Sequence, residues 1–144
     1  MAFEKDAITE ANKIMEKYDT CDPYKLARKS GCIVLYADLG PVNHAQRDYF
    51  KRINIITLNT RSDNNLQKYS LAHELGHVVL HRGFSTAFFR QTSGRKMINW
   101  AEKDANEFAM QIMLAQFSSE DRSHMTNYEL LEAMGLDQNL IDYV

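Results

Sequence analysis

The N-terminal part of the chain places hydrophobic side chains at helical spacing and then in a short continuous run. Between residues 7 and 18 apolar side chains recur every third or fourth position, which predicts an amphipathic helix. A second helix is predicted over residues 23–29, because Pro23 suits the first turn of a helix and Gly31 suits its end. Residues 32–36 are mostly apolar and β-branched and therefore predict a short strand.

The middle of the chain carries the strongest strand pattern and then returns to helical spacing. Residues 38–44 are rich in turn-forming side chains, whereas the run Ile-Asn-Ile-Ile-Thr-Leu at residues 53–58 predicts a strand. We place this strand at the edge of a small sheet. A polar loop over residues 59–65 leads to a predicted helix over residues 67–81, which Gly83 closes.

The C-terminal part of the chain predicts further helices. A loop over residues 83–96 precedes a long helix over about residues 97–116, and residues 123–144 predict two short helices, the first with a capping box of Thr126 and Glu129. This tail is similar in outline to a helix-turn-helix. It contains no Lys or Arg, however, and so lacks the phosphate contacts that supply most DNA affinity. We interpret it as a packing or partner surface.

The composition fits one globular α+β domain over residues 1–144, with a core at about residues 20–116 and a short helical tail over residues 123–144. Of the 144 residues, 44% are hydrophobic and 25% are charged, which is ordinary for a folded domain. The net charge of -2 provides no field for attracting nucleic acid. Cys21 and Cys32 form no Cys-x-x-Cys pair, which favours reduced thiols.

The lengths of the hydrophobic runs bear on where the protein is located in the cell. No run approaches the roughly 18 apolar residues that a membrane helix needs, and the N-terminus has no secretory signal pattern. We therefore expect a cytoplasmic protein that has no direct contact with a membrane or with nucleic acid.

The segment His73-Glu74-Leu75-Gly76-His77 matches the His-Glu-x-x-His zinc motif. At about 100° per residue the two histidines lie one turn and about 40° apart, so both imidazoles reach a single ion. Glu74 flanks the pair and suits the activation of a water molecule. The opposite side of the helix carries the apolar residues Leu71, Leu75, Val78 and Val79. The motif also fits a buried helix whose histidines only hydrogen-bond to neighbouring side chains. A third metal ligand elsewhere in the chain would distinguish a zinc site from this alternative.

The downstream helix offers three acidic residues, which helical phase separates. Glu102 falls within the stripe of apolar positions, whereas Asp104 and Glu107 point away from it. A carboxylate on an apolar face must be paired or bind a metal, because an unpaired buried charge is costly. Glu102 is therefore the expected third ligand, which leaves the fourth position of zinc to water. Asn106 is either a hydrogen-bond partner of a ligand imidazole or a simple helix-edge amide.

Other residues near the motif carry weaker signals. His81 stands at the helix end, and we interpret it as a helix-terminal or substrate-side residue rather than a ligand. The longer metzincin motif is excluded, because it needs a histidine at position 83, which is Gly83. His44 and His124 are predicted to be surface residues. Tyr69 is either a core residue or a group that stabilises an oxyanion.

Two motifs together resemble one known family. Ser70-Leu71-Ala72-His73-Glu74-Leu75-Gly76-His77, followed by Glu102-x-x-Ala105-Asn106-x-Phe108-Ala109, is similar to the ImmA/IrrE family of zinc-dependent metallopeptidases. The resemblance extends from about residue 20 to residue 116 and includes an Asp-Leu-Gly turn at residues 38–40. It implies that His73, His77 and Glu102 bind zinc and that Glu74 is catalytic.

The resemblance also implies a biological setting. The family is bacterial and phage-borne, and its members are often encoded beside a helix-turn-helix repressor that the peptidase cleaves. This chain lacks the proline that often follows the Phe108 helix in relatives, and it ends soon afterwards. A sensor domain like that of the larger radiation-response members is therefore not expected, nor is signalling by that route.

The resulting hypothesis is a small zincin-like zinc endopeptidase whose substrate is a DNA-binding repressor of a phage or mobile element. We expect an extended substrate to add to the edge strand at residues 53–58 while Phe84, Phe88 and Phe89 form either a side-chain pocket or ordinary loop packing. The alternative is a regulatory protein that keeps the zinc fold and docks a repressor or toxin without cutting it. The intact Glu74 favours the enzyme, since docking needs no general base.

Overall fold

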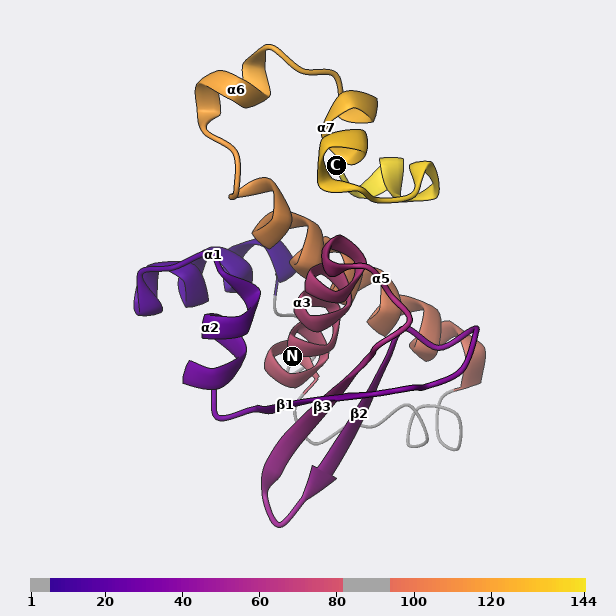
Figure 1. The fold of residues 1–144 in the computed structure, drawn as a ribbon. Coiled ribbons are helices and arrows are strands. Elements are labelled where there is room, and N and C mark those ends of the chain that lie inside the picture. The colour runs from indigo at the N-terminus through magenta and orange to yellow at the C-terminus, as the bar shows by residue number, and fades with distance from the viewer. Residues whose placement is uncertain (1–5, 82–93) are drawn as a thin grey trace.

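The computed structural model describes residues 6–81 and 94–144, and side chains for 6–81 and 99–144. Its elements, in chain order, are α1 (Ala7–Tyr18), α2 (Pro23–Lys29), β1 (Ile33–Ala37), β2 (Ala45–Phe50), β3 (Ile53–Asn59), α3 (Asn64–Leu80), α5 (Gly94–Leu114), α6 (Ser119–Ser123), α7 (Asn127–Met134) and the 3-10 helix η1 (Gln138–Tyr143). Helices pack beside one small mixed sheet, whose β2–β3 hairpin extends away from them (Figure 1). This arrangement confirms the predicted α+β zincin-like fold class.

The two N-terminal helices follow their sequence signals closely. Asp6 caps α1 by accepting a hydrogen bond from the backbone N–H of Thr9, and Asp22 caps α2 in the same way before Pro23. The inward face of α1 buries small and branched side chains, and this helix packs on α5. Cys21 is partly buried and Cys32 is buried, and no disulfide joins them.

The sheet has the strand order β1-β3-β2, with β1 parallel and β2 antiparallel to β3. The strand at residues 53–58 is therefore central, and its predicted position at the sheet edge is wrong. Its apolar run agrees with this central position, because Ile56 and Leu58 are fully buried. The edge on this side of β3 is formed by β2.

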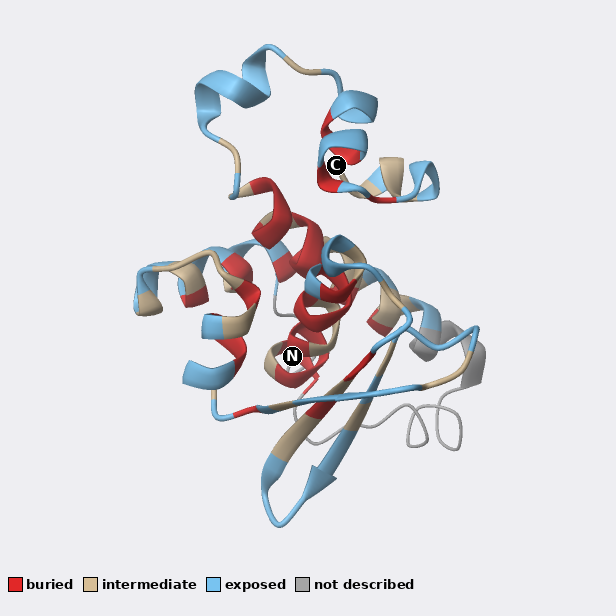
Figure 2. Cartoon of the chain, in the orientation of Figure 1, coloured by how far each residue is buried: buried red, intermediate tan, exposed pale blue. Residues whose placement is uncertain are grey.

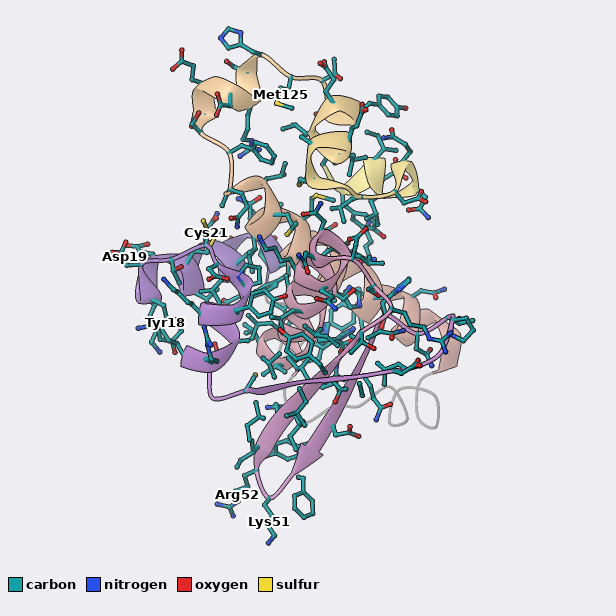
Figure 3. The ribbon with its side chains drawn as sticks, viewed as in Figure 1. Tyr18, Asp19, Cys21, Lys51, Arg52 and Met125 are labelled. Carbon is teal, nitrogen blue, oxygen red and sulfur yellow. The ribbon has the colours of Figure 1, made fainter. Side chains whose placement is uncertain are left out.

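The strand β2 was not predicted because its sequence carries none of the usual signals. Ala-Gln-Arg-Asp-Tyr-Phe is largely polar and mostly exposed, so no apolar alternation marks it. The β2–β3 hairpin turns at Lys51 and Arg52, whose positive φ angles of 50° and 66° suit a tight two-residue turn. Such turns are usually marked by Asn or Gly, which are missing here. Both residues lie at the tip of the hairpin, far from the helices (Figure 3).

The helices α3 and α5 pack closely because a glycine lies between them. A Cβ atom at Gly76 would lie 3.2 Å from the Cα atom of Ala105 and 3.1 Å from Cδ1 of Phe108. The absence of a side chain at this position therefore lets the two helix backbones approach. The buried residues of the molecule concentrate on these two helices (Figure 2). Leu71, Leu75 and Val78 are buried as predicted, whereas Val79 is only partly buried.

The boundaries of the two central helices differ slightly from prediction. The helix α3 begins at Asn64, because the side chain of Asp63 accepts a hydrogen bond from the backbone N–H of Leu66. The helix α5 begins at Gly94 and ends at Leu114. The predicted pocket residues Phe84, Phe88 and Phe89 lie outside the described residues.

The C-terminal segment contains α6, α7 and η1. The capping box of Thr126 and Glu129 is present, and α7 ends at Met134, with Gly135 as the C-terminal capping residue at a φ of 68°. The last element is a 3-10 helix that contacts both α7 and α5. None of the helices in the described ranges is both long enough and apolar enough to span a membrane.

Candidate metal centre

Two histidines from α3 and one glutamate from α5 converge at a single point. Nε2 of His73 lies 2.9 Å from Oε2 of Glu102, and Nε2 of His77 lies 3.0 Å from Oε1 of the same carboxylate. One ligand atom from each of the three residues lies within 4.8 Å of the others. The helical spacing of the motif and the close approach of α5 bring the predicted trio together.

The three residues fit a zinc ion in kind and spacing. Two imidazoles and one carboxylate are a donor set that zinc commonly binds at about 2.0–2.2 Å, which places tetrahedral donors roughly 3.3 Å apart. The observed donor group is compatible with that spacing after small side-chain movements. The Glu102 side chain is 44% exposed, so it lies at the rim of the apolar stripe rather than within it.

The ring of His73 is supported by Asn106 and Tyr69. Its Nδ1 lies 2.9 Å from Oδ1 of Asn106, and the hydroxyl of Tyr69 donates to the same oxygen at 2.8 Å. Because an amide oxygen only accepts hydrogen bonds, this contact places a proton on Nδ1 of His73 and leaves Nε2 for a ligand role. Of the two interpretations of Asn106, the structure therefore favours the hydrogen-bond partner of the imidazole.

The ring of His77 has a different support, which the sequence did not predict. Its Nδ1 lies 3.1 Å from Nδ1 of His81, and Nε2 of His81 lies 3.6 Å from Oδ2 of Asp104. His81 is the C-terminal capping residue of α3, as expected, but it is only 2% exposed. The prediction that Asp104 points away into solvent is wrong, since its side chain is 17% exposed and faces His81. The end of α3 covers this flank of α5.

The glutamate of the motif forms a charged hydrogen bond with the sheet. Nη1 of Arg47 on β2 donates to Oε2 of Glu74 at 2.9 Å, and the two side chains are 15% and 16% exposed. Such charge-assisted bonds are stronger than neutral ones and fix the orientation of the carboxylate. Sequence reasoning missed Arg47 because it missed the strand that carries it.

The surroundings shift the pKa values of His73, His77 and Glu102 in different directions. Burial would raise the pKa of Glu102, but hydrogen bonds from His73 and His77 outweigh this and hold the pKa well below its usual range. Burial lowers the pKa of His73, but its bond to Glu102 and the nearby Glu74 outweigh that effect, and the pKa is raised overall. Burial dominates at His77, whose pKa is lowered.

A cavity of about 830 Å³ lies beside His73 and Glu74. Its walls come from the segment before β2, from the first half of α3 and from residues 135–140 near the C-terminus. Apolar walls are provided by Val42, Leu66, Leu136 and Leu140. His44, predicted to be a surface residue, is exposed and also lines this cavity, whereas His124 is exposed in the segment between α6 and α7. The site is therefore open on the side of His73.

Comparisons with known proteins identify the family. The family model for the IrrE N-terminal-like domain, Peptidase_M78, matches residues 27–135. A relative named uncharacterized immunity region protein 2, from Bacillus phage phi105, is 28% identical over 102 residues, which are 71% of this chain. The match spans 64% of the length of that phage protein. With its histidine pair, its facing glutamate and this match, the chain belongs to the Peptidase_M78 family of IrrE N-terminal-like domains.

Proposed function

We propose that the protein is a zinc-dependent endopeptidase in which His73, His77 and Glu102 hold the metal and Glu74 is the general base. The observation that carries the proposal is the convergence of these three side chains next to Glu74, with His73 and Glu74 lining an open cavity. A carboxylate held beside a two-histidine, one-carboxylate site is the arrangement that hydrolytic zinc enzymes use.

The proposed mechanism assigns a task to each group of this chain. A zinc ion bound by the three residues would supply Lewis acidity for the scissile carbonyl and for the attacking water. Glu74 takes a proton from that water and later delivers it to the leaving amine. Arg47 keeps the Glu74 carboxylate oriented toward the site by its 2.9 Å hydrogen bond.

We propose that the substrate binds in the cavity and along the neighbouring sheet edge. The strand β2 is the edge closest to the site, since Arg47 reaches α3 from it, and an extended segment can pair with such an edge through main-chain hydrogen bonds. The apolar walls at Leu66 and Leu140 suit an apolar side chain of the substrate. This position replaces the earlier expectation of pairing at residues 53–58.

We further propose that the substrate is a DNA-binding repressor inside the cell. The relative from phage phi105 supports this, because its name places it in a phage immunity region, which agrees with the setting that the family resemblance implies. Incubation of the purified protein with the repressor encoded beside it should yield defined fragments. A chelator should suppress them, and added zinc should restore them.

The decisive variant is Glu74→Gln, because it keeps the shape of the side chain and removes its basicity. We expect zinc binding to persist. The rate of cleavage should fall about 100- to 10,000-fold, as is typical when a general base is lost. Glu107→Gln on α5 serves as the matched control and should cleave like the wild type. Cleavage at the wild-type rate by Glu74→Gln would show that Glu74 is not the general base, whereas a repressor that both proteins bind but neither cuts would favour the docking alternative.

A further inference from the structure

We infer that His81 and Asp104 act as positioning residues for His77: together they fix which nitrogen of the His77 ring carries the proton and thereby offer Nε2 to the metal. The inference rests on the metal site of the proposed function and does not depend on peptide cleavage. Neither residue belongs to the group of three converging ligands. Both lie behind His77, on the side away from Glu102.

When both rings are neutral, the protons of His77 and His81 can be arranged in only two ways. The two Nδ1 atoms of His77 and His81 are 3.1 Å apart, so in the neutral pair one of them donates and the other accepts. If His77 donates from Nδ1, its Nε2 carries a lone pair and can bind a metal. If His81 donates instead, the proton of His77 sits on Nε2, which blocks coordination.

Asp104 distinguishes between these two arrangements. When His77 donates, the proton of His81 lies on Nε2, which faces Oδ2 of Asp104 at 3.6 Å. In the reverse arrangement, the lone pair of His81 faces the negative carboxylate, which is repulsive. The distance of 3.6 Å is longer than a hydrogen bond but short enough for a strong electrostatic preference. Asp104 therefore favours the arrangement that a metal needs.

The need for Asp104 follows from a comparison with Glu102. Without a metal, the carboxylate of Glu102 lies 3.0 Å from Nε2 of His77 and attracts a proton to that nitrogen. Metal binding removes this proton, and the ring must then carry its proton on Nδ1. Asp104 lowers the cost of that exchange from the opposite end of the chain.

The surroundings bury His81 almost completely and leave the side chain of Asp104 17% exposed. His81 is 2% exposed, and its ring lies 5.2 Å from the ring of Trp100 in an edge-on contact. Hydrogen bonds in such a low-dielectric environment are stronger than in water, and a wrong tautomer costs more. Carboxylate–histidine pairs behind metal ligands commonly change metal affinity 10- to 100-fold when they are broken.

The test measures zinc affinity of the purified full chain by competition with a chromophoric chelator. Asp104→Leu, which has a similar volume and no acceptor, should weaken zinc binding about 10- to 100-fold. Asp104→Asn removes the negative charge at nearly constant volume, and its amide can turn either an oxygen or an N–H toward Nε2 of His81, so it should also weaken zinc binding. Glu107→Gln, on the same helix, is the matched control and should bind like the wild type. A double variant of Asp104→Leu and His81→Phe should bind no more weakly than the weaker single variant.

Nitrogen-15 NMR of the zinc-bound wild type gives a readout that a merely structural role would not move. The imidazole of His77 should carry its proton on Nδ1, and that of His81 on Nε2. A proton on Nδ1 of His81, or an Asp104→Leu variant that is folded by circular dichroism and binds zinc like the wild type, overturns the inference. If Asp104→Leu does not fold, the zinc affinity of the nearly isosteric Asp104→Asn decides, and an unchanged affinity of that variant overturns the inference. Loss of cleavage without loss of affinity would concern only the proposed function.

Discussion

His73 and His77 lie one turn apart on α3 and face the same carboxylate, yet their second nitrogens meet different partners. Nδ1 of His73 contacts the amide oxygen of Asn106, whereas Nδ1 of His77 contacts another histidine. An amide oxygen can only accept, so one residue is enough to fix the tautomer of His73. A histidine can accept or donate, and it needs a further partner, Asp104, to resolve its role.

The two sides of the site also differ in access. The side chain of His73 is 16% exposed and lines the cavity together with Glu74, whereas that of His77 is 5% exposed and faces the buried end of α3. In the proposed site, His73 would therefore be the ligand on the open side, where a substrate would bind, and His77 would hold the metal against the packed interior. Changes on the His73 side should therefore affect cleavage and affinity together, and changes on the His77 side mainly affinity.

The largest effect is expected when Glu102, the residue that contacts both histidines, is removed. Glu102→Ala deletes the carboxylate that bridges Nε2 of His73 and Nε2 of His77, so zinc affinity should fall by more than the roughly 100-fold upper range for supporting residues. Elemental analysis after dialysis measures the metal content. Glu107→Ala is the control and should keep one zinc per chain. Retention of stoichiometric zinc by Glu102→Ala would show that a different residue is the third ligand.

The second prediction concerns the support of His73 on the open side of the site. Asn106→Leu removes the acceptor of His73 Nδ1, and zinc affinity should fall about 10- to 100-fold, similar to the loss expected for Asp104→Leu. Asn106→Asp keeps an oxygen at this position and should recover most of the affinity. Chelator competition provides the measurement. If Asn106→Leu binds zinc like the wild type while Asp104→Leu does not, His73 needs no support and the comparison between the two sides fails.

The residues of the site divide into those that local sequence could reveal and those that it could not. The trio of His73, His77 and Glu102 was accessible because helical periodicity fixes which side chains share a face. The same arithmetic misplaced Asp104, since it assumed a single buried face on α5 and could not know that the end of α3 covers a second flank. Arg47 was missed because β2 is polar and mostly exposed, and its pairing partner is set by tertiary structure.

The fold was predicted to a similar extent. Helix boundaries in the N-terminal half agree because Asp6, Asp22 and Pro23 are local capping signals. Strand order is not local: the apolar run at residues 53–58 marks a strand but does not say how many neighbours it has. Ile56 and Leu58 are fully buried while Ile55 and Thr57 between them are only partly buried, and this pattern of one buried face fits an edge strand as well as a central one.

The third prediction concerns Gly76, which sets how closely α3 and α5 approach each other. In Gly76→Ala the new methyl group would lie 3.1–3.2 Å from Phe108 and Ala105, and overpacking of this kind typically costs about 1–3 kcal/mol. The better helix propensity of alanine offsets up to about 1 kcal/mol. We expect a net loss of about 1 kcal/mol in the free energy of unfolding, measured by urea denaturation of the metal-free protein. Unchanged or higher stability would show that α5 shifts without cost.

The fourth prediction follows the titration of the two histidines in the metal-free protein. The pKa of His73 is raised and that of His77 is lowered, so at a pH near 6.5 His73 should be mostly protonated and His77 mostly neutral. The stability from His73 is fully present below its unfolded pKa and is lost as the pH rises through its raised pKa. His77 acts in the opposite sense and destabilises the fold as the pH falls below its unfolded pKa. Proton NMR titration of the ring signals should separate the two residues, and identical midpoints would contradict the difference.

The smallest effect is expected for Tyr69→Phe, which removes only the hydroxyl that donates to Asn106 at 2.8 Å. Oδ1 of Asn106 keeps its contact with Nδ1 of His73, so no polar atom of this pair is left without a partner. The cost should stay near 0.5–1 kcal/mol, at the lower end for a hydrogen bond, with a change in zinc affinity below about threefold. Thermal unfolding and chelator competition test both values. An affinity loss as large as that of Asn106→Leu would mean that Tyr69 is the residue that orients the amide. A selective loss of cleavage at unchanged affinity would instead assign the hydroxyl to the oxyanion of the substrate, and it would make the His73 side the site of both metal support and catalysis.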